Sequence, residues 1–137
     1  MKSKTLRQSV FFKATPAQIC ELLLISKKHS AFTGSPAKIS TKVGGPFTAF
    51  DGHIEGTHVE IFKGRKIVQR WRTVNWPKGH YSTATWTFRS PDGGGCTMDF
   101  VQEGVPLEHF NSISQGWEEK YWEPMAAYFK EHDDDED

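Results

Sequence analysis

The sequence lacks most of the features that would point directly to a chemical activity. Its 137 residues include only two cysteines, Cys20 and Cys96, in no metal-binding spacing, so we expect two reduced thiols; a disulfide between them has no support. No apolar run approaches the roughly 18 residues that a membrane span requires, which excludes a transmembrane helix. The first residues lack the apolar core of a signal peptide, so we expect a cytoplasmic protein.

Catalytic and cofactor-binding motifs are also missing. There is no phosphate-binding loop, dinucleotide fingerprint or nucleophile elbow, and the glycines at 93–95 are typical of a turn. His53 and His58 are five residues apart on an expected strand, which directs them to opposite faces. Glu118 and Glu119 are adjacent on an expected helix, so they form no carboxylate pair. We therefore expect no metal, no cofactor and no enzymatic activity.

The net charge is zero, but the charges are unevenly distributed. The tail 131–137 holds six of the 17 acidic residues, so residues 1–130 carry 17 basic against 11 acidic residues, a net charge of +6. We expect one domain over 1–130 and a disordered tail over 131–137, because the tail has nothing to bury. The tail and the isoelectric point of about 7 argue against nucleic-acid binding.

Residues 61–91 contain seven basic residues and no acidic residue. Such a stretch is either a solvated face of the sheet or a surface for an acidic partner. An expected turn at 63–65 and an expected exposed loop at 75–80 are the parts least needed for a core, and an exposed tryptophan beside basic residues is typical of an interface. The predicted partner-binding residues are Lys63, Arg65, Trp76, Lys78 and His80.

Local signals predict an α+β fold. A strand over 4–14 precedes a helix that begins at Thr15 in a capping box, and a second short helix over 27–33 ends at Gly34. Residues 37–104 read as strands joined by turns, which predicts an antiparallel sheet. From Phe110 to Tyr128, aromatic residues recur at helical spacing; Pro124 should bend this helix near residue 120, and Gly116 should allow a close approach. We expect a curved antiparallel sheet of six or seven strands wrapped around this C-terminal helix.

Aromatic side chains form the strongest local signal. They pack either as a plain core or around a cavity between sheet and helix that holds an apolar ligand. The candidate cavity residues are Phe47, Trp71, Trp86, Phe88, Phe100, Trp117 and Tyr121.

Several segments carry a family resemblance that extends over about residues 10–130. They are FTGSPA at 32–37, GGPFTAFDG at 44–52, GRKIVQRWR at 64–72, WPKGHY at 76–81, GVP at 104–106 and GWEEKYWEP at 116–124. With these segments the chain resembles the C-terminal domain of activators of the heat-shock protein 90 ATPase. That family lies within the START-like, birch-pollen-allergen-like (SRPBCC) superfamily of helix-grip folds.

This resemblance implies a monomeric, non-enzymatic domain that binds a heat-shock protein 90-type chaperone. The full activators are similar only in their C-terminal half, so it implies a binding module rather than a complete activator. The alternative is a carrier or sensor of an apolar small molecule, because the same fold serves that purpose elsewhere. Polyketide cyclases share the fold too, but we can name no acid and base for such a reaction here.

Overall fold

The computed structural model describes residues 2–90 and 94–132, and the expected acidic tail lies almost wholly outside these residues. Seven strands form one sheet in the order β1-β7-β6-β5-β4-β3-β2, and every neighbouring pair is antiparallel. The strands are β1 (Ser3–Phe12), β2 (Lys38–Ile39), β3 (Pro46–Ala49), β4 (Ile54–Phe62), β5 (Lys66–Thr73), β6 (Ser82–Arg89) and β7 (Cys96–Pro106). The predicted antiparallel sheet is confirmed.

Two short helices follow β1, as predicted: α1 (Pro16–Leu24) and α2 (Ser26–Thr33). Thr15 accepts a hydrogen bond from the Gln18 amide while the Gln18 side chain accepts one from the Thr15 amide, which completes the expected capping box. Gly34 ends α2 in the left-handed conformation, with φ of 74°, which a residue without Cβ adopts at little cost.

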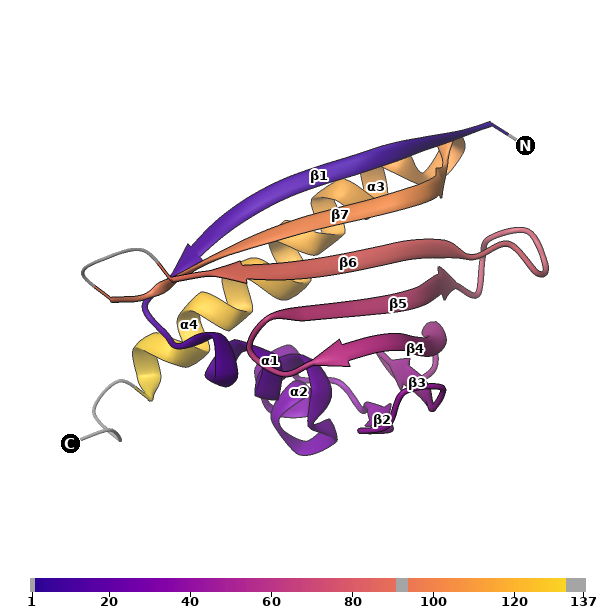
Figure 1. The fold of residues 1–137 in the computed structure, drawn as a ribbon. Helices are drawn as coiled ribbons and strands as arrows, with labels where there is room; N and C mark the ends of the chain where they lie inside the picture. The colour runs from indigo at the N-terminus through magenta and orange to yellow at the C-terminus, as the bar shows by residue number, and fades with distance from the viewer. Residues whose placement is uncertain (1, 91–93, 133–137) are drawn as a thin grey trace.

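The C-terminal helical region lies along the concave face of the sheet (Figure 1). It consists of a 3-10 turn η1 (Leu107–His109), α3 (Phe110–Trp117), a π turn η2 (Glu118–Trp122) and α4 (Glu123–Glu131). An apolar side of this region packs on the sheet and on α1, so the predicted grip of a curved sheet around a helix is confirmed.

A π turn lies where Pro124 was expected to bend the helix. Proline has no amide hydrogen, so an α-helical bond back to the carbonyl of residue 120 cannot form. The Glu123 amide instead donates to the Glu118 carbonyl, five residues earlier. This wider turn brings residues five apart onto one side, and the rings of Trp117 and Trp122 stack with centroids 5.2 Å apart at 16°.

The packing of β3, β4 and β5 depends on the absence of a side chain at Gly56 of β4, which pairs with Phe47 on β3 and Trp71 on β5. A Cβ at Gly56 would lie 1.8 Å from the Arg70 carbonyl oxygen and 2.7 Å from the Phe47 ring. The missing side chain therefore lets Phe47 lie across the strand and reach the interior. Gly116 is different: a Cβ there meets nothing within 4 Å, so the expected close approach at Gly116 is wrong.

Candidate functional site

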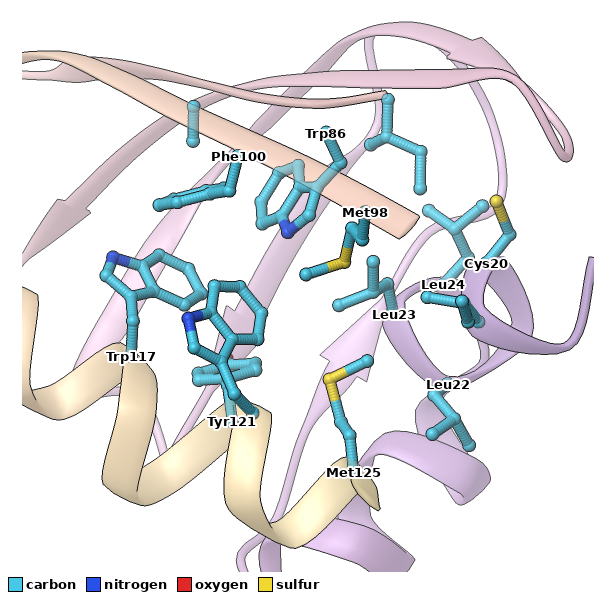
Figure 2. Close-up of a cluster of buried hydrophobic side chains, with 14 of the residues drawn as sticks. Cys20, Leu22, Leu23, Leu24, Trp86, Met98, Phe100, Trp117, Tyr121 and Met125 are labelled. Atoms are coloured by element: carbon cyan, nitrogen blue, oxygen red, sulfur yellow. The ribbon is translucent and has the colours of Figure 1, made fainter. Parts of the chain in front are cut away.

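The predicted aromatic set meets between the sheet and the C-terminal helix, around Trp117. The Trp117 ring centroid lies 4.5 Å from that of Phe100, 4.6 Å from Tyr121, 5.3 Å from Trp71 and 5.8 Å from Trp86. Figure 2 shows the helix residues Trp117 and Tyr121 directed toward Trp86 and Phe100 of the sheet. The rings fill this space by packing against one another.

Little room for a ligand remains inside this cluster. The interior void measures about 20 Å³, the space of one water molecule. Five of the predicted residues line it, namely Phe47, Trp71, Trp86, Trp117 and Tyr121. Phe100 is fully buried in the packed core and Phe88 packs against that core, and neither lines the void. At this place the described residues favour the first of the two alternatives, a packed core.

Buried hydrogen bonds fix the orientation of the helix on the sheet. The Trp117 indole donates to the Gln102 side-chain oxygen over 2.8 Å, and the Gln102 amide donates to the Ser82 hydroxyl over 2.9 Å. One turn later the Trp122 indole donates to the Gln8 side-chain oxygen over 2.6 Å. Each glutamine holds one tryptophan in a single register, which gives this interface a defined geometry.

A larger pocket opens at the end of the sheet where β5 ends, between β4, β5 and the C-terminal helix. We call it the end pocket; its volume is about 210 Å³. Its apolar wall consists of Phe50, Ile54, Trp71, Ile113, Trp117 and Tyr121. Its polar rim consists of His53, Asn75, His109, Ser112 and Lys120, and the buried Thr73 together with Gly116 completes the lining. Three of the predicted cavity residues, Trp71, Trp117 and Tyr121, thus line this ligand-sized pocket as well as the packed core.

The charge of the end pocket is positive. None of its lining residues is an aspartate or glutamate. The Lys120 ammonium lies 5.7 Å from the centre of the Phe50 ring and forms no ion pair with a carboxylate of the described chain. An unpaired cation beside an aromatic wall favours an anionic group.

A buried polar pair borders the same aromatic cluster. His29 Nε2 lies 3.0 Å from the Tyr121 hydroxyl oxygen, and both residues are buried. Burial lowers the pKa of His29 to about 4 and raises the pKa of Tyr121. Both side chains are therefore neutral at neutral pH, and they share one hydrogen bond between Nε2 and the hydroxyl oxygen. His29 Nδ1 has no hydrogen-bond partner within the described structure.

The predicted partner-binding residues fall into two groups at opposite ends of the sheet. Lys63 and Arg65 lie in the β4–β5 hairpin, whereas Lys78 and His80 lie in the loop that joins β5 to β6. The eight residues of β5 separate the two groups by roughly 26 Å at the usual rise per residue. They are therefore not one surface (Figure 1).

Trp76 is buried, with only 3% of its surface exposed, so the expectation of a solvent-facing tryptophan is wrong. Its ring centroid lies 5.5 Å from that of Trp71 and 5.8 Å from that of His80. The Arg72 guanidinium also donates a hydrogen bond to the Trp76 carbonyl oxygen, four residues later in the chain, over 3.0 Å. These contacts close the loop over the end of β5. His80 accordingly packs within the loop, with Nε2 2.7 Å from the Gly104 carbonyl oxygen.

Phe62 is an exposed aromatic residue beside basic residues, and it was not among the predicted partner-binding residues. It is 57% exposed and directly precedes Lys63 in the hairpin. Lys63 lies 3.6 Å from Glu21, but the other oxygen of that carboxylate already pairs with Lys28 at 2.5 Å. Arg65 forms no ion pair with a described carboxylate. The hairpin thus presents an apolar ring flanked by two cations.

The described residues contain no group of three His, Cys, Asp or Glu side chains that could hold a metal ion. His58 is buried on β4, where its Nε2 donates to the Ser40 carbonyl oxygen over 2.8 Å, and His53 lies exposed in the preceding turn. Cys20 and Cys96 are free and buried, and burial raises the pKa of both thiols. None of the described helices is long and apolar enough to cross a membrane.

Comparisons with known proteins identify relatives over most of the chain. Residues 13–130 match the family described as Activator of Hsp90 ATPase homolog 1-like protein. An activator of 90 kDa heat shock protein ATPase homolog from Dictyostelium discoideum is 36% identical over 116 residues, which are 84% of this chain and 30% of that protein. The human activator homolog 1 is 29% identical over 118 residues, which are 86% of this chain and 35% of that protein. This chain therefore spans about a third of the length of these relatives.

The fold recurs in solved structures. The structure of an HSP90 activator from Plasmodium falciparum superposes on this chain with a TM-score of 0.86 and 22% sequence identity. The superposition covers 92% of this chain and 96% of the Plasmodium chain. A protein from Chromobacterium violaceum has a TM-score of 0.73 with 22% identity, and covers 90% of this chain and 95% of that chain. At these identities the likeness shows the fold alone.

Proposed function

We propose, because the chain belongs to the Activator of Hsp90 ATPase homolog 1-like family, that it is a chaperone-binding module for a heat-shock protein 90-type chaperone. The observation that carries this proposal is the family match over residues 13–130, which spans nearly the whole helix-grip domain. The named relatives are activators of a chaperone ATPase, and they are about three times as long as this chain. The proposal therefore concerns the binding of the chaperone by this domain.

The β4–β5 hairpin is the surface that we propose for this interaction. Phe62 supplies an apolar anchor, and Lys63 and Arg65 supply positive charge that attracts an acidic partner. The opposite loop offers no exposed aromatic ring, because Trp76 is buried. Attraction between exposed charges is screened by salt, so association should weaken as ionic strength rises.

The acidic residues 131–137 are proposed to compete for the hairpin in the free protein. The helix α4, which leads into them, packs Phe129 against Phe12 with centroids 5.7 Å apart. Phe12 pairs with Cys96 at the same end of the sheet as the hairpin. Removal of residues 133–137 should therefore strengthen the binding of an acidic partner.

We propose that the chain catalyses no reaction itself. A binding partner changes the activity of a chaperone only if it binds one conformation of the chaperone more tightly than another. The free, buried thiols fit a reducing compartment, so we propose that the protein acts in the cytoplasm. We also propose that it acts as a monomer.

The test is titration calorimetry of the chain against a purified 90 kDa heat-shock chaperone at two salt concentrations. A double charge reversal, Lys63→Glu with Arg65→Glu, should lower the affinity about tenfold or more. Lys78→Glu makes the same kind of change at the opposite end of the sheet and serves as the matched control. Thermal melts confirm that each variant is folded, and chaperone ATPase rates with and without the chain report activation.

Two results would contradict this proposal in different ways. No binding by the folded wild-type chain removes the chaperone-binding function. Binding that the hairpin reversal leaves unchanged, but that Lys78→Glu weakens, moves the interface to the loop at 75–80.

A further inference from the structure

We propose that the end pocket binds a small amphiphilic carboxylate. The apolar body of this ligand lies against Trp71, Trp117 and Tyr121, and its carboxylate pairs with the Lys120 ammonium at the rim. This inference goes beyond the chaperone-binding proposal and does not rest on it, because the pocket and the hairpin lie at opposite ends of β5.

The size of the pocket limits the body of the ligand. Its volume of about 210 Å³ exceeds the roughly 150 Å³ of an apolar cavity that accepts benzene, and is below the roughly 300 Å³ at which drug-sized pockets begin. One aromatic ring or an alkyl chain of about eight carbons fits this space. A sterol or a long-chain lipid does not.

The polar rim determines the charge of the headgroup. Lys120 is the only residue of the lining that carries a permanent positive charge, and no lining residue is acidic. The Ser112 hydroxyl and the rings of His53 and His109 add hydrogen-bonding groups at the same rim. Lys120 is exposed, so water partly screens its attraction to a carboxylate, but an anion is still favoured over a neutral or cationic headgroup.

Backbone strain at the rim supports a built site. Phe50 has a φ of +50°, which a bulky side chain rarely adopts. This conformation is held by a hydrogen bond from the Asp51 amide to the Pro36 carbonyl oxygen over 2.9 Å, and it places the Phe50 ring 5.7 Å from that of Tyr121. Lys120 lies above the same ring. Strained residues of this kind recur where a protein holds a ligand.

Octanoate is the probe for the experiment, with octan-1-ol and octylamine as neutral and cationic ligands of the same chain length. Binding is followed by titration calorimetry and by tryptophan fluorescence, below the concentration at which octanoate forms micelles. Trp71 and Trp117 line the pocket, so a ligand there should change the emission. Octanoate should bind saturably with one site and about threefold more tightly than octan-1-ol, and octylamine should bind least.

Two variants separate the apolar body from the headgroup. Gly116→Leu fills the pocket, because a Cβ at Gly116 meets nothing within 4 Å, and leucine is also the better helix former. This variant should melt no lower than wild type and should lose octanoate binding. Lys120→Met keeps the length of the side chain and removes its charge, so octanoate should bind about threefold more weakly while octan-1-ol binds as before. Lys130→Met removes an exposed charge from α4, outside the pocket lining, and should change neither the affinity for octanoate nor that for octan-1-ol.

Three outcomes would overturn the proposal. The first is the absence of saturable octanoate binding to folded wild-type protein. The second is octanoate binding that survives in folded Gly116→Leu, which places the ligand elsewhere. The third is equal affinity for octanoate and octan-1-ol with no effect of Lys120→Met, which makes the site purely apolar. Chaperone binding by the same samples is measured separately, so neither proposal depends on the other.

Discussion

Replacement of Trp117 tests whether the C-terminal helix is held on the sheet by its indole. The side chain is 3% exposed, packs among the rings of the core and donates to Gln102. Trp117→Ala removes the ring, at a cost of about 3–5 kcal/mol in the free energy of unfolding. It also leaves the buried Gln102 oxygen without its donor, at a further cost of about 1–3 kcal/mol. The sum approaches the whole stability of an ordinary domain, roughly 5–15 kcal/mol.

Trp117→Phe is the more informative variant, because it keeps an aromatic ring and removes the donor. We expect a loss of about 1–3 kcal/mol, which lowers the melting temperature by several degrees for a chain of this length. A double-mutant cycle with Gln102→Leu isolates the hydrogen bond, and its coupling energy should be at least about 1 kcal/mol. Phe62→Ala, at an exposed aromatic, is the control and should cost about 0.5 kcal/mol or less.

The assay is urea and thermal denaturation followed by far-ultraviolet circular dichroism, because the substitution removes a tryptophan that fluorescence would report. A fall in melting temperature of only a degree or two for Trp117→Ala would refute the argument that this helix docks through its aromatic side. Additive losses in the cycle would show that the indole and Gln102 contribute independently.

Three further predictions concern stability. The pKa of His29 is about 4 in the folded protein and rises to its ordinary value near 6.5 on unfolding. The unfolded state therefore binds the proton first, and stability is lost as pH falls through this window. Urea titrations should show a loss of about 2 kcal/mol in the free energy of unfolding between pH 7.5 and 5, and a smaller loss in His29→Gln. Gly56→Ala should cost about 2–3 kcal/mol in the same assay, because its Cβ would collide with the Arg70 carbonyl. Thr15→Ala should cost about 1 kcal/mol by removing the cap that the Gln18 amide uses, seen as a lower melting temperature.

The parts of the fold that follow from local chemistry could be predicted from the sequence. The capping box at Thr15, the left-handed Gly34 and the hairpin turn at 63–65 depend only on residues close together in the chain, and these three appear where expected. The apolar stripe of the C-terminal helix likewise predicted the burial of Trp117 and Tyr121. The resemblance supplied the overall architecture.

The parts that failed depend on contacts between distant segments. Loop composition predicted an exposed Trp76, but its ring packs against Trp71 and lies 6.4 Å from the His109 ring, which arrives from the other end of the chain. Trp122 lies off the α-helical stripe and was missed because a π turn brings it beside Trp117. The separation of the hairpin from the loop at 75–80 could have been predicted, since the strand between them must carry the chain across the sheet.

The two proposed sites could influence each other only through an element with two arrangements. The helical region extends toward both: Lys120 in η2 borders the end pocket, and Phe129 in α4 packs on Phe12, at the same end of the sheet as the hairpin but across β7 and β6 from it. Converting the π turn to α-helix would change the register of α4 by one residue, a rotation of about 100°. That rotation would break the bond from Trp122 to Gln8 and the stacking of Trp122 on Trp117. These contacts hold one register, so occupancy of the pocket by octanoate should leave chaperone affinity unchanged within about twofold.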